Sequence, residues 1–122
     1  MKKDILKNEL KKAYLRLLSA IKEAKTDLEI DGVIQRFEFT FELTWKFLKE
    51  YLYDQGVICN SPKSCLKEAY KINLIDNEEI WLNMLKDRNL STYIYDFETS
   101  RDIFKRIKEL YIFEFEKIIN LE

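Results

Sequence analysis

The chain has 122 residues, which suits one hydrophobic core, and its two glycines and one proline are too few for a turn-rich all-β fold. Charged residues make up 35% and hydrophobic residues 47%, a balance typical of an amphipathic helical bundle. The formal net charge of −1 excludes a global basic field, so any contact with RNA must be local. No apolar run approaches the roughly 20 residues that cross a bilayer. We therefore expect a single helical domain over residues 1–122 and no contact with a membrane.

The first helix is predicted over about residues 4–27. Apolar side chains recur there every three or four positions, as on the buried face of a bundle helix, and this stripe extends to Leu28. Asp31-Gly32 is the predicted break before the second helix.

The second helix should run to about Gln55, with Gly56 as its C-terminal cap. Residues 37–45 alternate apolar and polar side chains as a strand does, but no turn residue interrupts the whole segment up to Gly56. A strand averages about 5–6 residues, so length favours a helix. Wound as a helix, Phe39 and Leu43 form a second apolar face, which predicts a central position in the bundle or an oligomer interface.

Three further helices begin at residues that cap helix N-termini, namely Ser61 before Pro62, Asn77, and Asp96 with Thr99. The first should end near residue 72 and the last near residue 120. The predicted fold is all-α: an antiparallel four-helix bundle with an additional short helix, five helices in total.

The sequence holds two cysteines, Cys59 and Cys65, and no histidine. A metal site would need at least two more nitrogen or sulfur ligands, so we expect no metal and no other cofactor. A local disulfide is geometrically possible. Because no signal peptide precedes it, we expect a cytoplasmic protein with both thiols reduced.

Arg88 lies at the edge of the stripe that the fourth helix would bury, three residues after Leu85 and seven after Trp81. A guanidinium there must find a partner or face a cleft, because an unpaired buried charge costs several kcal/mol. It could extend to the surface, pair with a carboxylate of a neighbouring helix, or serve a functional site.

Residues 88–96 resemble the signature of the HEPN superfamily, and more narrowly of the nucleotidyltransferase substrate-binding proteins, the partners of minimal nucleotidyltransferases. The signature consists of Arg, four residues, His, one residue and Tyr. Arg88 and Tyr95 match it, whereas Tyr93 stands at the histidine position. Residues 36–46 resemble the second helix of the same family, and the similarity runs in detail from about residue 33 to residue 107.

The resemblance implies a bundle that usually forms homodimers and, in active members, cleaves RNA without a metal. Arg88 would bind the scissile phosphate, and Asn89 could hold the phosphate or fix the loop. A tyrosine hydroxyl is protonated at neutral pH and is a poor general base, but Tyr93 could donate a hydrogen bond or stack on a base. In some relatives the partner attaches AMP to the tyrosine at the position of Tyr95. Tyr95 is thus a candidate acceptor, or a tyrosine that packs at a helix junction.

Four carboxylates complete the candidate site. Glu38 and Glu42 lie four residues apart on one helix face and could form ion pairs or act as acid–base groups. Their candidate partners are Arg36, Lys46 and Arg88. Asp87 and Asp96 could substitute for the missing histidine in proton transfer.

The absent histidine favours a non-catalytic or weakly catalytic partner subunit. Such a subunit would bind a separately encoded minimal nucleotidyltransferase and present a nucleotide, another substrate or Tyr95 to it. The alternative is a metal-independent HEPN ribonuclease toxin of a toxin–antitoxin pair, regulated by nucleotidylation, which would bind RNA. A third hypothesis is a helical dimer whose motif has a purely structural use.

Overall fold

The computed structural model describes residues 2–93 and 96–121, and the described part is helical without a strand. It contains α1 (Lys2–Glu23), α2 (Asp27–Asp54), α3 (Pro62–Lys71), α4 (Glu78–Ser91) and a continuous C-terminal helix. That last helix consists of α5 (Phe97–Arg106), a π-helical turn η1 (Ile107–Tyr111) and α6 (Ile112–Ile119). The predicted all-α fold is confirmed, and so is the helical interpretation of residues 37–45.

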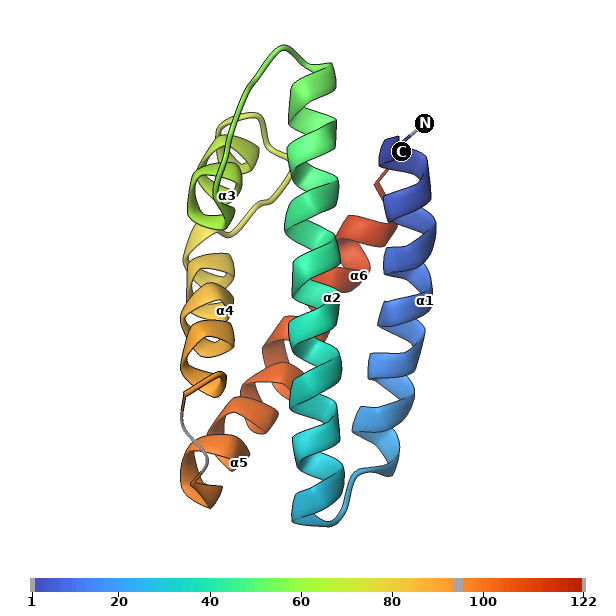
Figure 1. Cartoon of the computed structure of the whole chain (residues 1–122), viewed down its shortest axis with the longest axis vertical. Helices are drawn as coiled ribbons and strands as arrows, with labels where there is room; N and C mark the ends of the chain where they lie inside the picture. The colour runs from blue at the N-terminus through green and yellow to red at the C-terminus, as the bar shows by residue number, and fades with distance from the viewer. Residues whose placement is uncertain (1, 94–95, 122) are drawn as a thin grey trace.

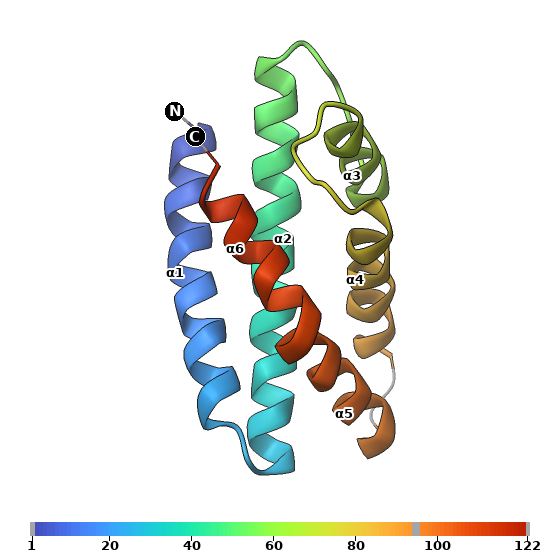
Figure 2. The ribbon, with the colours of Figure 1, turned by 180° about the vertical axis from the view of Figure 1, so that it is seen from behind.

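The long helices form an antiparallel bundle around α2. Figure 1 shows α1 and α4 on either side of α2, each running opposite to it, with the short α3 beyond the start of α4. The C-terminal helix crosses this layer diagonally (Figure 2), contacting α2 through α5, α4 through η1 and α1 through α6. None of the helices in residues 2–93 and 96–121 combines the length and apolar character that crossing a membrane requires.

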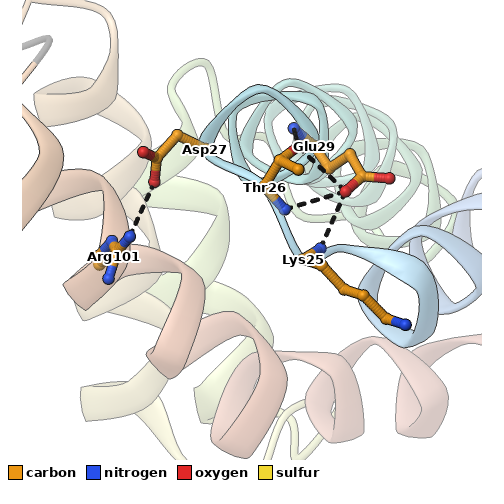
Figure 3. Close-up of polar contacts among 5 residues, drawn as sticks. All are labelled: Lys25, Thr26, Asp27, Glu29 and Arg101. Atoms are coloured by element: carbon orange, nitrogen blue, oxygen red, sulfur yellow. Dashed lines mark hydrogen bonds and ion pairs between the residues drawn. The ribbon is translucent and has the colours of Figure 1, made fainter.

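The junction between α1 and α2 differs from the predicted one. Thr26 begins α2 through a capping box: its hydroxyl accepts a hydrogen bond from the Glu29 amide (3.2 Å), and the Glu29 carboxylate accepts one from the Thr26 amide (2.9 Å; Figure 3). The break predicted at Asp31-Gly32 is therefore wrong, and Gly32 continues the helix. Leu28, which the pattern assigned to the buried stripe of the first helix, is 81% exposed.

The other predicted caps are confirmed: three at helix N-termini and one at a helix C-terminus. The side chains of Ser61, Asn77 and Asp96 each accept a hydrogen bond from the backbone amide three residues later. Gly56, with φ of 82°, adopts the left-handed conformation just after α2, which glycine permits at a helix C-terminus. An ion pair between Arg101 and Asp27 (3.1 Å; Figure 3) ties α5 to the first turn of α2.

A cluster of buried aromatic rings fixes the helices that carry the candidate site. Phe37 of α2 stacks on Tyr111 with ring centroids 5.6 Å apart, and Trp81 of α4 packs edge-on against Phe115 at 5.6 Å. Phe41 joins the two pairs through contacts with Phe37 and Trp81. Burying each ring contributes roughly 1.5–3 kcal/mol, so α2, α4 and the C-terminal helix are held in one arrangement.

A disulfide joins Cys59, in the loop between α2 and α3, to Cys65 of α3. The expectation of reduced thiols is therefore wrong for this structure. The turn that starts α3 brings the two Cα atoms to 5.2 Å, within the range that a disulfide spans, and both residues are buried.

Candidate functional site

Arg88, on the last turn of α4, pairs with a carboxylate of α2. Its Nη2 donates a hydrogen bond to Glu42 Oε2 at 2.7 Å, and its Nη1 donates one to Asn89 Oδ1 at 3.2 Å. One of the environments considered for Arg88, an ion pair with a neighbouring helix, is present in the structure, and Glu42 is the partner. The packing of α4 beside α2 creates this contact between residues 46 positions apart.

The ion pair lies in a cavity of about 650 Å³ between α2 and the end of α4. We call it the Arg88 groove. Five predicted site residues line it: Glu38, Glu42, Arg88, Asn89 and Tyr93. Phe39 and Thr92 complete the lining. Tyr93 is 84% exposed, so its ring and hydroxyl are available to a ligand at this cavity.

Glu38 separates the Arg88 groove from a second cavity of about 420 Å³, which it also lines. That cavity extends toward α5, where Ser100 and Ile103 contribute to its wall. Burial raises the pKa of the Glu38 carboxyl above its usual range, and the nearby Arg88 guanidinium offsets part of this shift. The Glu38 carboxyl therefore holds its proton to a higher pH than an exposed glutamate does.

The end of α4 follows from local side-chain hydrogen bonds. The hydroxyls of Ser91 and Thr92 both donate to the Arg88 carbonyl, at 3.0 and 3.1 Å, and so satisfy it where the helical ladder stops. Tyr95, the candidate acceptor, lies outside the described residues.

Asp96 is placed apart from the Arg88 groove, as the cap of α5. Its two carboxylate oxygens accept hydrogen bonds from the Thr99 amide (2.8 Å) and hydroxyl (3.0 Å). These bonds hold the pKa of the Asp96 carboxyl below its usual range, because they stabilise its charged form. This environment suits a permanent anion at a helix N-terminus better than a group that exchanges protons.

Asp87 precedes Arg88 but points into the protein. Its carboxylate accepts two hydrogen bonds from Arg106, both at 2.8 Å, and one from the Tyr111 hydroxyl at 2.5 Å. Burial raises the pKa of Tyr111, and the adjacent Asp87 carboxylate raises it further. Asp87 is thus saturated with donors and fixes the end of α4 to the C-terminal helix, which sequence reasoning did not foresee.

The π-helical turn explains how two residues of one helix reach the same carboxylate. Arg106 and Tyr111 are five positions apart, which in a regular α-helix would direct them about 140° apart. The turn at Ile107–Tyr111 has hydrogen bonds between residues five apart, so residues at that spacing are brought to the same side. The π turn therefore builds the buried Asp87 cluster, which we define as Asp87, Arg106 and Tyr111.

Residues 6–121, nearly the whole chain, match the protein family described as "Nucleotidyltransferase substrate binding protein like". The chain belongs to this family. The similarity of residues 88–96 to the HEPN signature agrees with this assignment.

Two known proteins are similar to this family member. "Probable ribonuclease HepT" of Haemophilus influenzae is 30% identical over 91 residues, which cover 70% of this chain and 62% of that protein. A crystal structure from Thermus thermophilus has 32% identity and a TM-score of 0.84, with 90% of this chain and 95% of that chain covered.

A Haemophilus influenzae structure described as revealing the fold of a substrate binding domain of a nucleotidyltransferase has 24% identity and a TM-score of 0.81. The similarity covers 93% of this chain and 96% of that chain. At this identity, the similarity concerns the fold alone.

Proposed function

We propose that this protein is a non-catalytic or weakly catalytic partner subunit of a separately encoded minimal nucleotidyltransferase. One observation carries the proposal: Tyr93, and no imidazole, stands at the histidine position of the Arg88 groove, where Arg88 pairs with Glu42 at 2.7 Å. The family's ribonuclease reaction needs an imidazole at that position to exchange the proton of the attacking hydroxyl. The family description supports the association with a nucleotidyltransferase.

The Arg88 groove would present a nucleotide or another substrate to the partner enzyme. Its volume of about 650 Å³ suits a small ligand, and Asn89 and Tyr93 offer hydrogen-bonding groups at an accessible surface. Tyr95 follows two residues later and is the proposed acceptor of a nucleotidyl group. The modification would join the tyrosine oxygen to the α-phosphorus of ATP and release pyrophosphate.

The test combines co-purification with mass spectrometry. The protein is co-expressed with a minimal nucleotidyltransferase from the same organism, and the purified protein is then incubated with ATP and Mg²⁺. We expect a stable complex and one added adenylyl group on the wild type, none on Tyr95→Phe, and normal addition on the matched control Tyr53→Phe, an exposed tyrosine outside the Arg88 groove. Absence of both complex and modification would contradict the proposal.

We also propose that the protein forms a homodimer, in line with its family resemblance. Phe39, on the second apolar face predicted for α2, is 59% exposed, and Leu43 is half-buried. Sedimentation equilibrium of the wild type should give twice the chain mass of 14.8 kDa. A monomer at micromolar concentration would contradict this part of the proposal.

A second candidate function is that of a metal-independent ribonuclease toxin of a toxin–antitoxin pair, regulated by nucleotidylation. It is favoured by the placement of Glu38, whose pKa is raised, in the same cavity as Arg88. In this mechanism the RNA phosphate displaces Glu42 from Arg88, and Glu38 accepts the proton of the 2′-hydroxyl as its oxygen bonds to phosphorus. The bond from phosphorus to the 5′-oxygen breaks, and that oxygen takes a proton from water. The relative named "Probable ribonuclease HepT" supports keeping this candidate.

An RNA cleavage assay in the presence of a metal chelator separates the two candidates. Cleavage by the wild type that Arg88→Ala and Glu38→Gln abolish would replace the partner proposal with the ribonuclease. If the wild type does not cleave RNA but Tyr93→His does, the Arg88 groove is a cleavage site that lacks only a general base. The partner proposal expects the wild type, Arg88→Ala and Glu38→Gln to be silent.

A further inference from the structure

A separate cavity of about 630 Å³ lies along the exposed side of α3, at the end of the bundle away from α5 (Figure 1). We call it the α3 groove. Its charged lining residues are Lys63, Lys67, Glu68 and Lys71 of α3 and Glu78 of the first turn of α4. The buried residues of α3 lie on the opposite side of that helix and fix it to the core; they are Cys65, Leu66 and Ala69. The lysines are thus carried by a helix that is itself held in place.

The three lysines form a row along α3. They are four residues apart, so their side chains leave one face of the helix at intervals of about 6 Å. Lys71 pairs with Glu68 at 3.1 Å in an exposed contact, which is a weak interaction. In the part of the chain that the structure describes, neither Lys63 nor Lys67 has a hydrogen bond or ion pair. Like charges at this spacing repel each other, so an anionic partner that bridges them would stabilise the helix.

The α3 groove has a net positive charge, although the whole chain has a net charge of −1. Three lysines line it against two carboxylates, and of these Glu68 is already engaged by Lys71. Glu78 stands in the first turn of α4, where the helix dipole favours a carboxylate. Arg88 differs, because a ligand must displace Glu42 to reach it. An anion on the α3 groove meets Lys63 and Lys67 directly.

Tyr70 adds an aromatic ring to this cationic surface. Its side chain is 45% exposed and lines the α3 groove from the same face of the helix as the lysines. Tyrosine supplies a large apolar contact area with few rotatable bonds, and it is enriched at the centres of protein interfaces. A small polyanion such as an inorganic polyphosphate would use the lysines but would gain little from the ring. The combination favours a protein partner.

The α3 groove and the Arg88 groove share one side of α4. Glu78 lines the first and Asn89 the second. These residues are eleven positions apart on one continuous helix, so they point in directions about 20° apart and are separated by about 17 Å along its axis. A small domain is about 30 Å across. One protein can therefore contact α3 and reach the Arg88 groove at the same time.

We propose that the α3 groove is the surface on which the partner nucleotidyltransferase docks, through an acidic helix of that enzyme. Carboxylates at every fourth position of a helix repeat at about 6 Å, the spacing of the lysine row, so they pair with Lys63, Lys67 and Lys71 in turn. An apolar side chain of the same helix packs on Tyr70. The inference rests on the proposed function for the identity of the enzyme, and it adds a docking surface distinct from the groove that presents the substrate.

The affinity for the purified nucleotidyltransferase, measured by isothermal titration calorimetry at several salt concentrations, tests this inference. The double variant Lys63→Glu, Lys67→Glu should weaken binding by about 100-fold or more, because two attractive pairs become contacts between like charges. The matched control is the double variant Lys11→Glu, Lys22→Glu, which reverses the same number of charges at exposed positions of α1 outside both grooves. It should bind as tightly as the wild type, and binding of both should weaken as salt rises.

The aromatic anchor and the place of contact are tested separately. Tyr70→Ala should weaken binding by about tenfold, whereas Tyr70→Phe should retain it, and circular dichroism checks that both variants are folded. A carbodiimide joins a lysine amine to a carboxylate in direct contact. Treatment of the complex should therefore link Lys63 or Lys67 to one acidic helix of the enzyme, as identified by mass spectrometry.

Three outcomes would overturn the inference and leave the partner function intact: a complex that tolerates Lys63→Glu with Lys67→Glu, equal losses in this variant and in the control, or cross-links from other lysines only. Tripolyphosphate that binds the wild type without competing with the enzyme would instead assign the groove to a small polyanion. A wild type that binds no nucleotidyltransferase contradicts the proposed function itself, and this inference with it, so the two failures are distinguishable.

Discussion

Asp87 and Arg88 are adjacent charged residues at the end of α4, yet their surroundings differ in almost every respect. Asp87 is 7% exposed and accepts hydrogen bonds from Arg106 and Tyr111. Arg88 lies at a cavity open to solvent and has one carboxylate partner, Glu42. One side of α4 is anchored to the C-terminal helix, and the other side faces a groove.

The comparison shows that the charge of Asp87 holds the fold together, whereas the charge of Arg88 is accessible to a ligand. Every acceptor of Asp87 is engaged by a donor that the fold holds in place, so exchanging its partners would cost desolvation on both sides. The ion pair of Arg88 is partly solvated, so a phosphate or carboxylate of a ligand could replace Glu42 at a much smaller cost. A buried anchor next to a partly open cation is a reasonable basis for a binding site, because it fixes the backbone that carries the cation.

The largest expected effect is at Asp87. Replacing it with Ala leaves the Arg106 guanidinium and the Tyr111 hydroxyl without their acceptor, which should lower the free energy of unfolding by about 3 kcal/mol. Urea denaturation measures this, and Asp87→Asn, which keeps an acceptor oxygen, should lose less. A loss below that of Arg88→Ala would contradict the assignment of Asp87 as the anchor.

Tyr111 should have an intermediate effect. Tyr111→Phe removes one hydrogen bond to a buried carboxylate and keeps the stacked ring, so we expect a loss of about 1.5 kcal/mol. Tyr14→Phe is the matched control, since it removes a hydroxyl that donates to Glu116 at 3.1 Å in a partly buried contact. Its loss should be about 0.5 kcal/mol in the same denaturation experiment, and equal losses would argue against a special role for the buried Asp87 cluster.

The Arg88–Glu42 pair should contribute less than either. A double-mutant cycle of Arg88→Ala and Glu42→Ala should give a coupling energy of about 1 kcal/mol or less, because both side chains are about a third exposed. Coupling comparable to the loss at Asp87 would mean that Arg88 is structural and that the groove is not an open site.

The smallest effect concerns pH and Glu38. Its pKa is raised in the folded protein, so the folded state holds this proton more tightly than the unfolded state. The stability that this bound proton adds is fully present below the pKa that Glu38 has in the unfolded chain. It is lost as the pH rises through the higher pKa of Glu38 in the folded protein. Glu38→Gln should therefore gain thermal stability relative to the wild type between about pH 4 and about pH 7, and a difference in Tm that does not grow over this range would contradict the shift.

Helix positions were predictable where the signal is local. Ser61, Asn77 and Asp96 each cap a helix through an amide three residues away, so the sequence contains the complete interaction. The capping box of Thr26 and Glu29 has the same local spacing, but the predicted break was placed on the turn residues Asp31-Gly32 alone. Glycine is tolerated within a helix when the surrounding residues bury an apolar face, as α2 does here.

The site was predictable in part. The HEPN-like stretch located Arg88, Asn89 and Tyr93 at one cavity, and helical spacing placed Glu38 and Glu42 on one face of α2. The partners of Asp87 are 19 and 24 residues away, and their meeting depends on how the C-terminal helix crosses α4 and on a π turn that has no recognised sequence signal. The disulfide likewise depends on the distance between Cys59 and Cys65 across a loop, which spacing alone did not fix.

The π turn has a further consequence for the phase of the C-terminal helix. Each residue of an α-helix adds about 100° of rotation, and a π turn accommodates one extra residue without breaking the rod. The apolar side of α5 can therefore face α2 while that of α6 faces α1, although both belong to one continuous helix. If all residues of η1 were wound as a regular α-helix, α6 would turn by about 100° and carry Phe115 and Ile118 out of the core. Deleting one residue from η1 would instead let the turn close as α-helix and keep both side chains in the core.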